Sequence, residues 1–396
     1  MKKFTALLLA LVMVLGLSAC NAPAGDDPAA ANFKVAMITD YGDITDESFN
    51  QATYEACKEY CEGAKIDFSY FKPAGDSNPE RVAMIEKAVD EGYNVIVMPG
   101  FAFAGAVVEA APQNKDVKFV VLDVAKGDYL DAAVTAAGET YDYNPDNWDL
   151  SKYVDLSNVY TMIYQEELCG YMAGYAAVKL GYTHLGFLGG MAVPAVVRYG
   201  YGFVQGADAA AADMGADITL EYVYGNQFSG DADITAYMDN WYQTLGVQAV
   251  FACGGGIYTS AAEAAAKVGG KVIGVDTDQA PIIDKYAEDM TITSAMKGLG
   301  ASTKDALDKI IKQDKWADLA GQIVNLGLVS GDDPEANFVQ IPMESTLWAE
   351  GLFTQDDYKA IVKDMFDGKI TVANDISVAP ADNAKTITVN AYDNIK

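Results

Sequence analysis

The sequence contains a single histidine, His184, and only five cysteines among its 396 residues. One histidine makes a Ser-His-Asp or Cys-His catalytic arrangement hard to build. Cys57 and Cys61 lie four residues apart on an expected helix face, without a second cysteine pair or a histidine partner. A zinc site is therefore not expected, and no other metal or cofactor is indicated. With Cys169 and Cys253, these cysteines are interpreted as buried free thiols, and a disulfide between two of them is left open.

Positive charge and long hydrophobic runs are also scarce. The chain has 27 Lys and Arg against 56 Asp and Glu, for a formal net charge of −29. Such a surface repels polyanions, so no nucleic-acid partner is expected. The longest apolar run, Phe4 to Leu17, is too short to cross a bilayer core of about 30 Å, which needs about 20 residues. No later segment could span a membrane.

The N-terminal residues instead have the pattern of a secretory signal. Lys2 and Lys3 precede the apolar run, and small residues lead to Cys20. This pattern predicts a lipoprotein signal peptide over residues 1–19, cleaved before a lipidated Cys20. Residues 20–32, rich in Ala, Pro, Gly and Asp, are expected to form a flexible lipid-anchored linker. The protein would then work on the extracytoplasmic face of the bacterial cell membrane; an ordinary signal peptide that ends near a cysteine is the alternative.

Short β-rich runs alternate with helical spacing in two successive series along the rest of the chain. Such alternation predicts α/β architecture with parallel sheets and helices on both faces, and each series has the size of one doubly wound domain. Residues 125–157, rich in Asp, Tyr, Asn and Gly, interrupt the series and are expected to form a long surface excursion with a hairpin. The expected strands are 33–39, 65–71, 94–98, 118–122, 159–163, 184–188, 219–224, 249–252, 271–275 and 291–295.

Polar residues that follow the strands are the candidate ligand-binding groups, because doubly wound folds bind ligands beyond the carboxyl ends of their strands. Asp40 ends the first expected strand, and Phe49 and Asn50 follow it within a dense polar cluster. An aromatic face, an amide and a carboxylate together suit a planar heteroaromatic ligand with a hydrogen-bonding edge. Core packing is the alternative role for Phe49. Asp123, Asp276 and the glycines at 254–256 follow other strands.

Five motifs in one order resemble the basic membrane protein family, the purine-nucleoside-binding lipoproteins of ABC-type importers. The resemblance covers roughly residues 34 to 310. It implies a type I periplasmic-binding-protein-like fold with three hinge crossovers. The N-terminal domain would hold residues 33–163 plus about 280–325, and the C-terminal domain 164–279 plus about 326–396. The motifs are TDYGDITDESFNQATYEA, YQEELCGYMAGYAA, GFLGGMAVPAVVRYGYGFVQG, VIGVDTDQ and TSAMKG.

The same resemblance assigns roles to nine residues. Two phenylalanines would sandwich the base, and a carboxylate and an amide would bind its edge. Two further carboxylates would accept hydrogen bonds from ribose hydroxyls, two glycines would allow close approach to the sugar, and a lysine would lie near the ribose. A salt bridge to a carboxylate is the alternative role of the lysine. In that order the residues are Phe49 and Phe228, Asp40 and Asn50, Asp123 and Asp276, Gly254 and Gly255, and Lys297.

The resemblance implies that the protein captures a purine nucleoside (guanosine, inosine or adenosine) and passes it to an ABC permease with its ATPase, without catalysis. Several carboxylates against one lysine would repel a phosphate, which favours a nucleoside over a nucleotide. Three alternatives stay open: a binding protein for a sugar or another small polar ligand, a secreted nucleoside hydrolase, and a lipid-anchored receptor.

Overall fold

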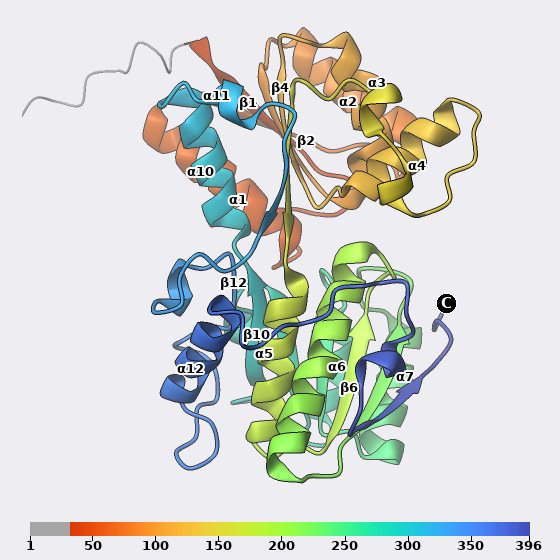
Figure 1. The fold of residues 1–396 in the computed structure, drawn as a ribbon, viewed down its shortest axis with the longest axis vertical. Helices are drawn as coiled ribbons and strands as arrows, with labels where there is room; N and C mark the ends of the chain where they lie inside the picture. Colours follow the sequence, from red (N-terminus) through yellow and green to blue (C-terminus); the bar gives the residue numbers. More distant parts are fainter. Residues whose placement is uncertain (1–31) are drawn as a thin grey trace, which may run out of the picture.

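The computed structural model describes residues 32–396, which form two α/β domains joined by several chain segments (Figure 1). Within this range the first sheet has six parallel strands in the order β11-β5-β4-β3-β1-β2. Alternate residues of its strands face opposite layers: Val35 and Met37 pack against α1 and α10, and Ala36 and Ile38 against α2 and α3. The strands are β1 (Lys34–Ile38), β2 (Asp67–Phe71), β3 (Val95–Pro99), β4 (Lys118–Leu122), β5 (Val159–Tyr164) and β11 (Ile323–Leu326).

The second sheet has the order β12-β10-β9-β8-β6-β7-β13 among the same residues. All of its pairings are parallel except that of β12 with β10. The two sheets confirm the predicted doubly wound α/β class. The strands are β6 (His184–Gly189), β7 (Thr219–Tyr224), β8 (Ala249–Cys253), β9 (Lys271–Asp276), β10 (Thr291–Lys297), β12 (Val339–Gln340) and β13 (Thr388–Ala391).

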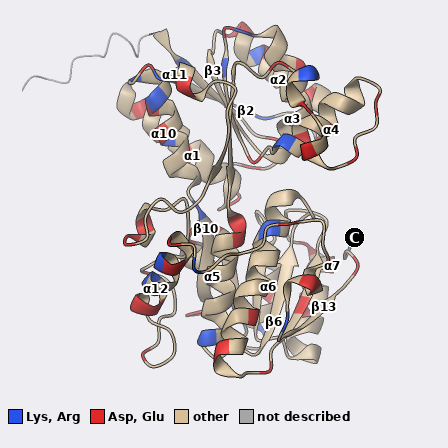
Figure 2. Cartoon of the chain, viewed as in Figure 1, with Lys and Arg blue, Asp and Glu red and all other residues tan. Residues whose placement is uncertain are grey.

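Helices cover both faces of each sheet (Figure 1), and acidic residues are spread over both domains (Figure 2). The helices of the first domain are α1 (Phe49–Ala64), α2 (Asn78–Asp90), α3 (Ala104–Ala110), α4 (Lys126–Ala136), α10 (Leu299–Ile311) and α11 (Trp316–Leu319). Those of the second domain are α5 (Glu166–Lys179), α6 (Pro194–Met214), α7 (Ala232–Asn240), α8 (Tyr258–Ala266), α9 (Ala280–Ile283) and α12 (Gln355–Phe366).

The chain crosses between the domains three times, after β5, after β10 and after β11. The second crossing lies later than the boundary near residue 280 that the sequence suggested. Strand β10 pairs with β9 in the second sheet, so the return to the first domain begins after Lys297. The apolar pattern of a buried strand does not reveal which of two sheets it joins.

The segment 125–157 differs from the expected excursion, because it contains a helix and no hairpin. Helix α4 is capped by Asp128, whose carboxylate accepts the Ala125 N–H at 2.7 Å. Tyr141 folds back onto the helix and packs with Trp148 in a small apolar cluster. The sequence did not indicate this helix, because the few apolar residues that form the cluster are scattered among many polar ones.

Two further expectations concern cysteines and the N-terminus. Cys57, Cys61, Cys169 and Cys253 are buried and free, as the default interpretation had them. The signal peptide and Cys20 lie outside the described residues. No helix between residues 32 and 396 combines the length and the apolar character needed to cross a membrane.

Helices α5 and α6 pack unusually closely through glycines on both partners. A Cβ atom on Gly202 would lie 2.1 Å from the carbonyl oxygen of Glu167, and one on Gly206 would lie 2.0 Å from that of Tyr171. On the facing helix, a Cβ on Gly170 would lie 2.2 Å from the Tyr199 oxygen. These contacts involve backbone atoms, which cannot move aside as a side chain would. The crossing therefore fixes the N-termini of both helices beside the cleft between the domains.

We expect Gly202→Ala to destabilise the protein by about 2–3 kcal/mol, because the added methyl group must push two helices apart. Urea unfolding followed by circular dichroism measures the effect. Gly63→Ala is the matched control, since a Cβ atom there meets nothing within 4 Å, and it should raise stability by about 0.5 kcal/mol. Equal unfolding midpoints for the two variants would contradict the close crossing.

Candidate ligand-binding site

A cavity of about 640 Å³ lies between the two domains, lined by residues that follow strands of both sheets. Its size is typical of small-molecule sites. The structure brings together every residue that the sequence had proposed for ligand binding. These lining residues are Asp40, Phe49, Asn50, Asp123, Phe228, Gly254, Gly255, Asp276 and Lys297.

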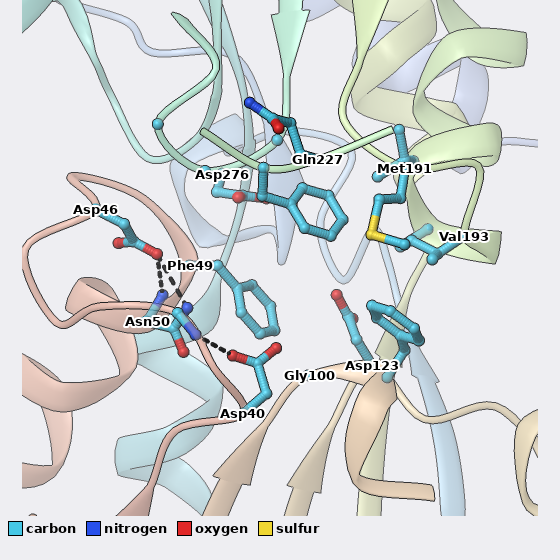
Figure 3. Close-up of a pocket in the computed structure, with 18 of the residues that line it drawn as sticks. Asp40, Asp46, Phe49, Asn50, Gly100, Asp123, Met191, Val193, Gln227 and Asp276 are labelled. Carbon is cyan, nitrogen blue, oxygen red and sulfur yellow. Dashed lines mark hydrogen bonds between the residues drawn. The ribbon is translucent and has the colours of Figure 1, made fainter. Parts of the chain in front are cut away.

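Asp40 presents a carboxylate to the cavity from the end of β1 (Figure 3). Its Oδ1 accepts the backbone N–H groups of Tyr41 at 2.6 Å and Gly42 at 2.8 Å. Burial raises the pKa of Asp40, although these two hydrogen bonds oppose the rise. Gly100, at a φ of 124°, leaves the space for the carboxylate, because a Cβ atom there would lie 2.7 Å from Oδ2. Oδ2 therefore occupies the space that the missing side chain of Gly100 leaves, and it takes no part in the two backbone hydrogen bonds made by Oδ1.

Asn50 is oriented by Asp46, which also caps α1. The carboxylate of Asp46 accepts the N–H groups of Asn50 and Gln51, both at 3.0 Å. It also accepts a hydrogen bond from Nδ2 of Asn50 at 3.1 Å. The amide is therefore held in one orientation, and its buried Oδ1 has no partner. An unpartnered buried acceptor is costly unless a ligand supplies the donor.

The two phenylalanines reach the cavity from opposite domains. Phe49 begins α1 and points into the cavity (Figure 3), and Lys297 Nζ lies 4.6 Å from the centroid of its ring. Phe228 follows β7 and packs on two glycines, because Cβ atoms on Gly190 and Gly254 would lie 2.4 and 2.7 Å from its Cδ1 atom. The glycine run that was expected to let a sugar approach therefore makes room for a phenylalanine. Gly254 also has a φ of 140°, which other residues rarely adopt.

Lys297 is buried in a cluster of carboxylates drawn from both domains. It donates to Asp123 Oδ2, and its Nζ lies 3.5 Å from Glu166 Oε1 and 3.7 Å from Asp276 Oδ1. Burial acts to lower the pKa of Lys297, but the three negative charges outweigh this effect and raise it. The lysine is therefore charged, and the salt bridge that the sequence left as an alternative role is present.

Asp123 and Asp276 have left-handed backbones, with φ of 61° and 65°. Strain of this kind is common at binding sites. Asp276 accepts hydrogen bonds from Ser48 Oγ at 2.6 Å and from the Tyr199 hydroxyl at 3.2 Å. Asp123 keeps one buried oxygen, Oδ1, without a partner. Burial, opposed by the charge of Lys297, raises the pKa of Asp123.

Several residues of the site were not singled out from the sequence. Glu166 is fully buried and accepts a hydrogen bond from Arg198 Nε at 2.7 Å. Both residues lie in the quoted motifs, but a search restricted to strand ends overlooks charged groups in the first two turns of a helix. Met191 and Val193 line the cavity opposite Asp40 (Figure 3). In the part of the chain that the structure describes, no group of three or more His, Cys, Asp or Glu side chains could hold a metal ion.

Two α/β domains with a polar and aromatic cavity between them are the architecture of periplasmic-binding-protein-like proteins. A sequence model of the Bmp family, described as ABC transporter substrate-binding protein PnrA-like, matches residues 33–331. The chain belongs to this family, as the motifs indicated. The class has a small molecule as its ligand and works outside the cytoplasm with a membrane permease.

Similar proteins agree with this assignment. The chain is 27% identical to the ABC transporter nucleoside-binding protein BmpA of Lactococcus lactis subsp. cremoris, over 93% of this chain and 97% of that protein. It is 26% identical to basic membrane protein B of Borreliella afzelii, over 80% and 84% of the two chains. An ABC transporter solute-binding protein of Aeropyrum pernix has the same fold, with a TM-score of 0.61 at 20% identity over 86% and 87% of the two chains.

We expect Lys297→Met to destabilise the protein by about 3–5 kcal/mol at pH 7, because it leaves buried carboxylates without their cation. Without the ammonium group the already raised pKa of Asp123 rises further, so near neutral pH the folded state binds a proton that the unfolded state releases. The deficit relative to the wild type should therefore shrink from pH 7 to pH 5. Urea midpoints at both pH values measure it. Lys267→Met, which removes an exposed pair with Asp239, should cost about 1 kcal/mol or less at either pH.

Proposed function

We propose that this substrate-binding protein captures a purine nucleoside between its two domains and delivers it to an ABC permease. One observation carries the proposal. Two buried acceptor atoms without partners, Asn50 Oδ1 and Asp123 Oδ1, belong to residues that line a cavity to which Phe49 and Phe228 also contribute. A flat base with a donor edge, joined to a sugar with hydroxyl donors, supplies what these groups lack.

The base would lie between the rings of Phe49 and Phe228. Each stacked face contributes on the order of 1–3 kcal/mol. The edge of the base would donate to Asn50 Oδ1 and to Asp40 Oδ2. Purines fit this description through the ring N–H or amino groups of guanosine, inosine and adenosine.

The ribose would lie beside the Lys297 cluster. Its hydroxyl groups would donate to Asp123 Oδ1 and to the carboxylate of Asp276, and Lys297 would hold these carboxylates in place. Hydrogen bonds to charged groups contribute about 1.5–3 kcal/mol each. With two stacked faces they can supply the roughly 8 kcal/mol that micromolar affinity requires, after the ordering costs of binding. A phosphate would meet three carboxylates around one lysine.

We also propose the anchor and the release step. Lipid on Cys20, with residues 20–32 as a linker, would keep the protein at the outer surface of the cell membrane. The nucleoside would leave unchanged when the domains separate at the permease. The nucleoside-binding name of the Lactococcus relative supports the ligand class, and the signal-like sequence before Cys20 supports the anchor.

Calorimetric titration with guanosine, inosine, adenosine and ribose tests the proposal. We expect micromolar or tighter binding of at least one nucleoside and weak binding of ribose. Tight ribose binding without nucleoside binding would replace the proposal with a sugar-binding function. Chromatography of inosine after incubation with the protein should show no free hypoxanthine, whose appearance would indicate a hydrolase.

Phe49→Ala and Phe228→Ala should each weaken nucleoside binding at least tenfold, because each removes one stacking face of about 1–3 kcal/mol. Phe366→Ala is the matched control, since this ring is 49% exposed on α12 and does not line the cavity. Titration calorimetry measures all three variants, and circular dichroism checks that they fold. Wild-type affinity in both cavity variants would show that the wrong aromatic pair was chosen.

Asp123→Asn should weaken inosine binding by roughly tenfold or more and leave hypoxanthine binding within about twofold of the wild type. The substitution keeps the shape of the side chain but removes the charge that strengthens a hydrogen bond from a ribose hydroxyl. Competition binding of the two ligands measures the difference. Equal losses for nucleoside and free base would remove the ribose from this position.

A further inference from the structure

The VIGVDTDQ motif contains two residues, Thr277 and Gln279, that do not line the cavity. Both contact the other domain instead. The backbone carbonyl oxygen of Glu47, just before α1, accepts a hydrogen bond from Gln279 Nε2 at 3.1 Å and another from Thr277 Oγ1 at 3.2 Å. One carbonyl of the first domain is therefore bound by two side chains of the second.

Gln279 is held rigidly within its own domain. Its side chain is fully buried, and its Oε1 accepts the N–H of Val275 at 3.0 Å. Its own N–H donates to Ser294 Oγ at 3.1 Å. Gly274 leaves the space for it, because a Cβ atom there would lie 2.9 Å from Cβ of Gln279. Because Oε1 of Gln279 is hydrogen-bonded within its own domain, only the NH₂ group of the amide can reach across the domain boundary.

The acceptor is also held in a specific conformation. Glu47 has a φ of 53°, a left-handed backbone that is uncommon for a residue other than glycine, asparagine or aspartate. Its N–H donates to Gln51 Oε1 at 3.1 Å within the first turn of α1. The neighbouring residue Ser48 donates to Asp276 across the same boundary at 2.6 Å. Phe49 and Asn50 follow directly, so this contact lies next to the ligand-binding residues.

We propose that the carbonyl of Glu47, with Thr277 and Gln279, forms an interdomain latch that stabilises the closed state and slows release of the ligand. These hydrogen bonds can form only when the domains are together. They involve no atom of the cavity, so they add to closure independently of which ligand is bound. Because the latch adjoins Phe49, opening it would also free the end of α1 that carries the stacking ring.

Two variants remove the latch bonds separately. Gln279→Glu keeps the acceptor for Val275 but replaces the donor with an oxygen that faces the Glu47 carbonyl. Thr277→Val keeps the side-chain shape and removes the other donor. Each should speed release of inosine roughly three- to tenfold, the effect of one lost hydrogen bond. In the absence of ligand, each should raise the radius of gyration measured by small-angle X-ray scattering.

Gln248→Glu is the matched control. This glutamine lies in the same domain, and its Oε1 accepts the N–H of Thr183 at 2.7 Å and that of His184 at 3.1 Å. The variant adds the same charge without touching the first domain. Its inosine release rate, measured by stopped-flow fluorescence, and its scattering should match those of the wild type.

The inosine-release experiment rests on the proposed nucleoside function, whereas the scattering of the ligand-free protein does not. The outcomes therefore distinguish a failure of the latch from a failure of the proposed function. Wild-type release rates in both latch variants would overturn the latch. If the wild type binds no inosine, the proposed function fails, and the latch is then tested by the scattering of the ligand-free proteins alone. Scattering curves of the two latch variants that match the wild-type curve would overturn the latch. If Gln279→Glu does not fold, Thr277→Val carries the same test.

Discussion

One buried ammonium group joins the two halves of this protein. Lys297, at the end of β10, lies among carboxylates from both domains: Asp123 follows β4 of the first sheet, and Asp276 is the last residue of β9 in the second. Buried charges of one sign repel strongly unless a cation lies between them. Without Lys297 the acidic side chains of the cavity could not be held close together. The cation therefore makes a cluster of buried carboxylates compatible with a cavity between the two domains.

The shape around this charge cluster depends on missing side chains. Gly170, Gly202 and Gly206 bring α5 and α6 close together, and Arg198 of α6 binds Glu166 of α5. Glu166 in turn lies 3.5 Å from Lys297. Gly100 and Gly254 give room to the carboxylate of Asp40 and the ring of Phe228. Protein interiors are packed densely, so the absence of one methyl group at a glycine allows a contact that no other residue would permit. These glycines act through geometry, because each leaves free the space that a Cβ atom would fill.

Much of the candidate site could be predicted because parallel strands end at one edge of a sheet. Asp40 and Asp123 follow strands and Asp276 ends one, and the topology brings all three to one cavity. Glu166 and Arg198 could not be found this way, since they lie in the first two turns of α5 and α6 and meet only through helix packing. The sequence could not show which sheet β10 joins, because its apolar pattern is compatible with either of the two sheets. The helix in 125–157 was missed because only a few apolar residues, scattered among many polar ones in the same segment, form its small cluster.

The sequence by itself determined the local structure and the class of protein. Apolar periodicity marked the strands and helices, and ordered motifs indicated the family, because both depend on neighbouring residues. Only the tertiary structure decided how distant groups meet. It showed that Gly254 supports Phe228, and that Gln279 reaches the Glu47 carbonyl in the opposite domain. Such contacts join residues far apart in the chain, and their distances follow from the packing of two whole domains.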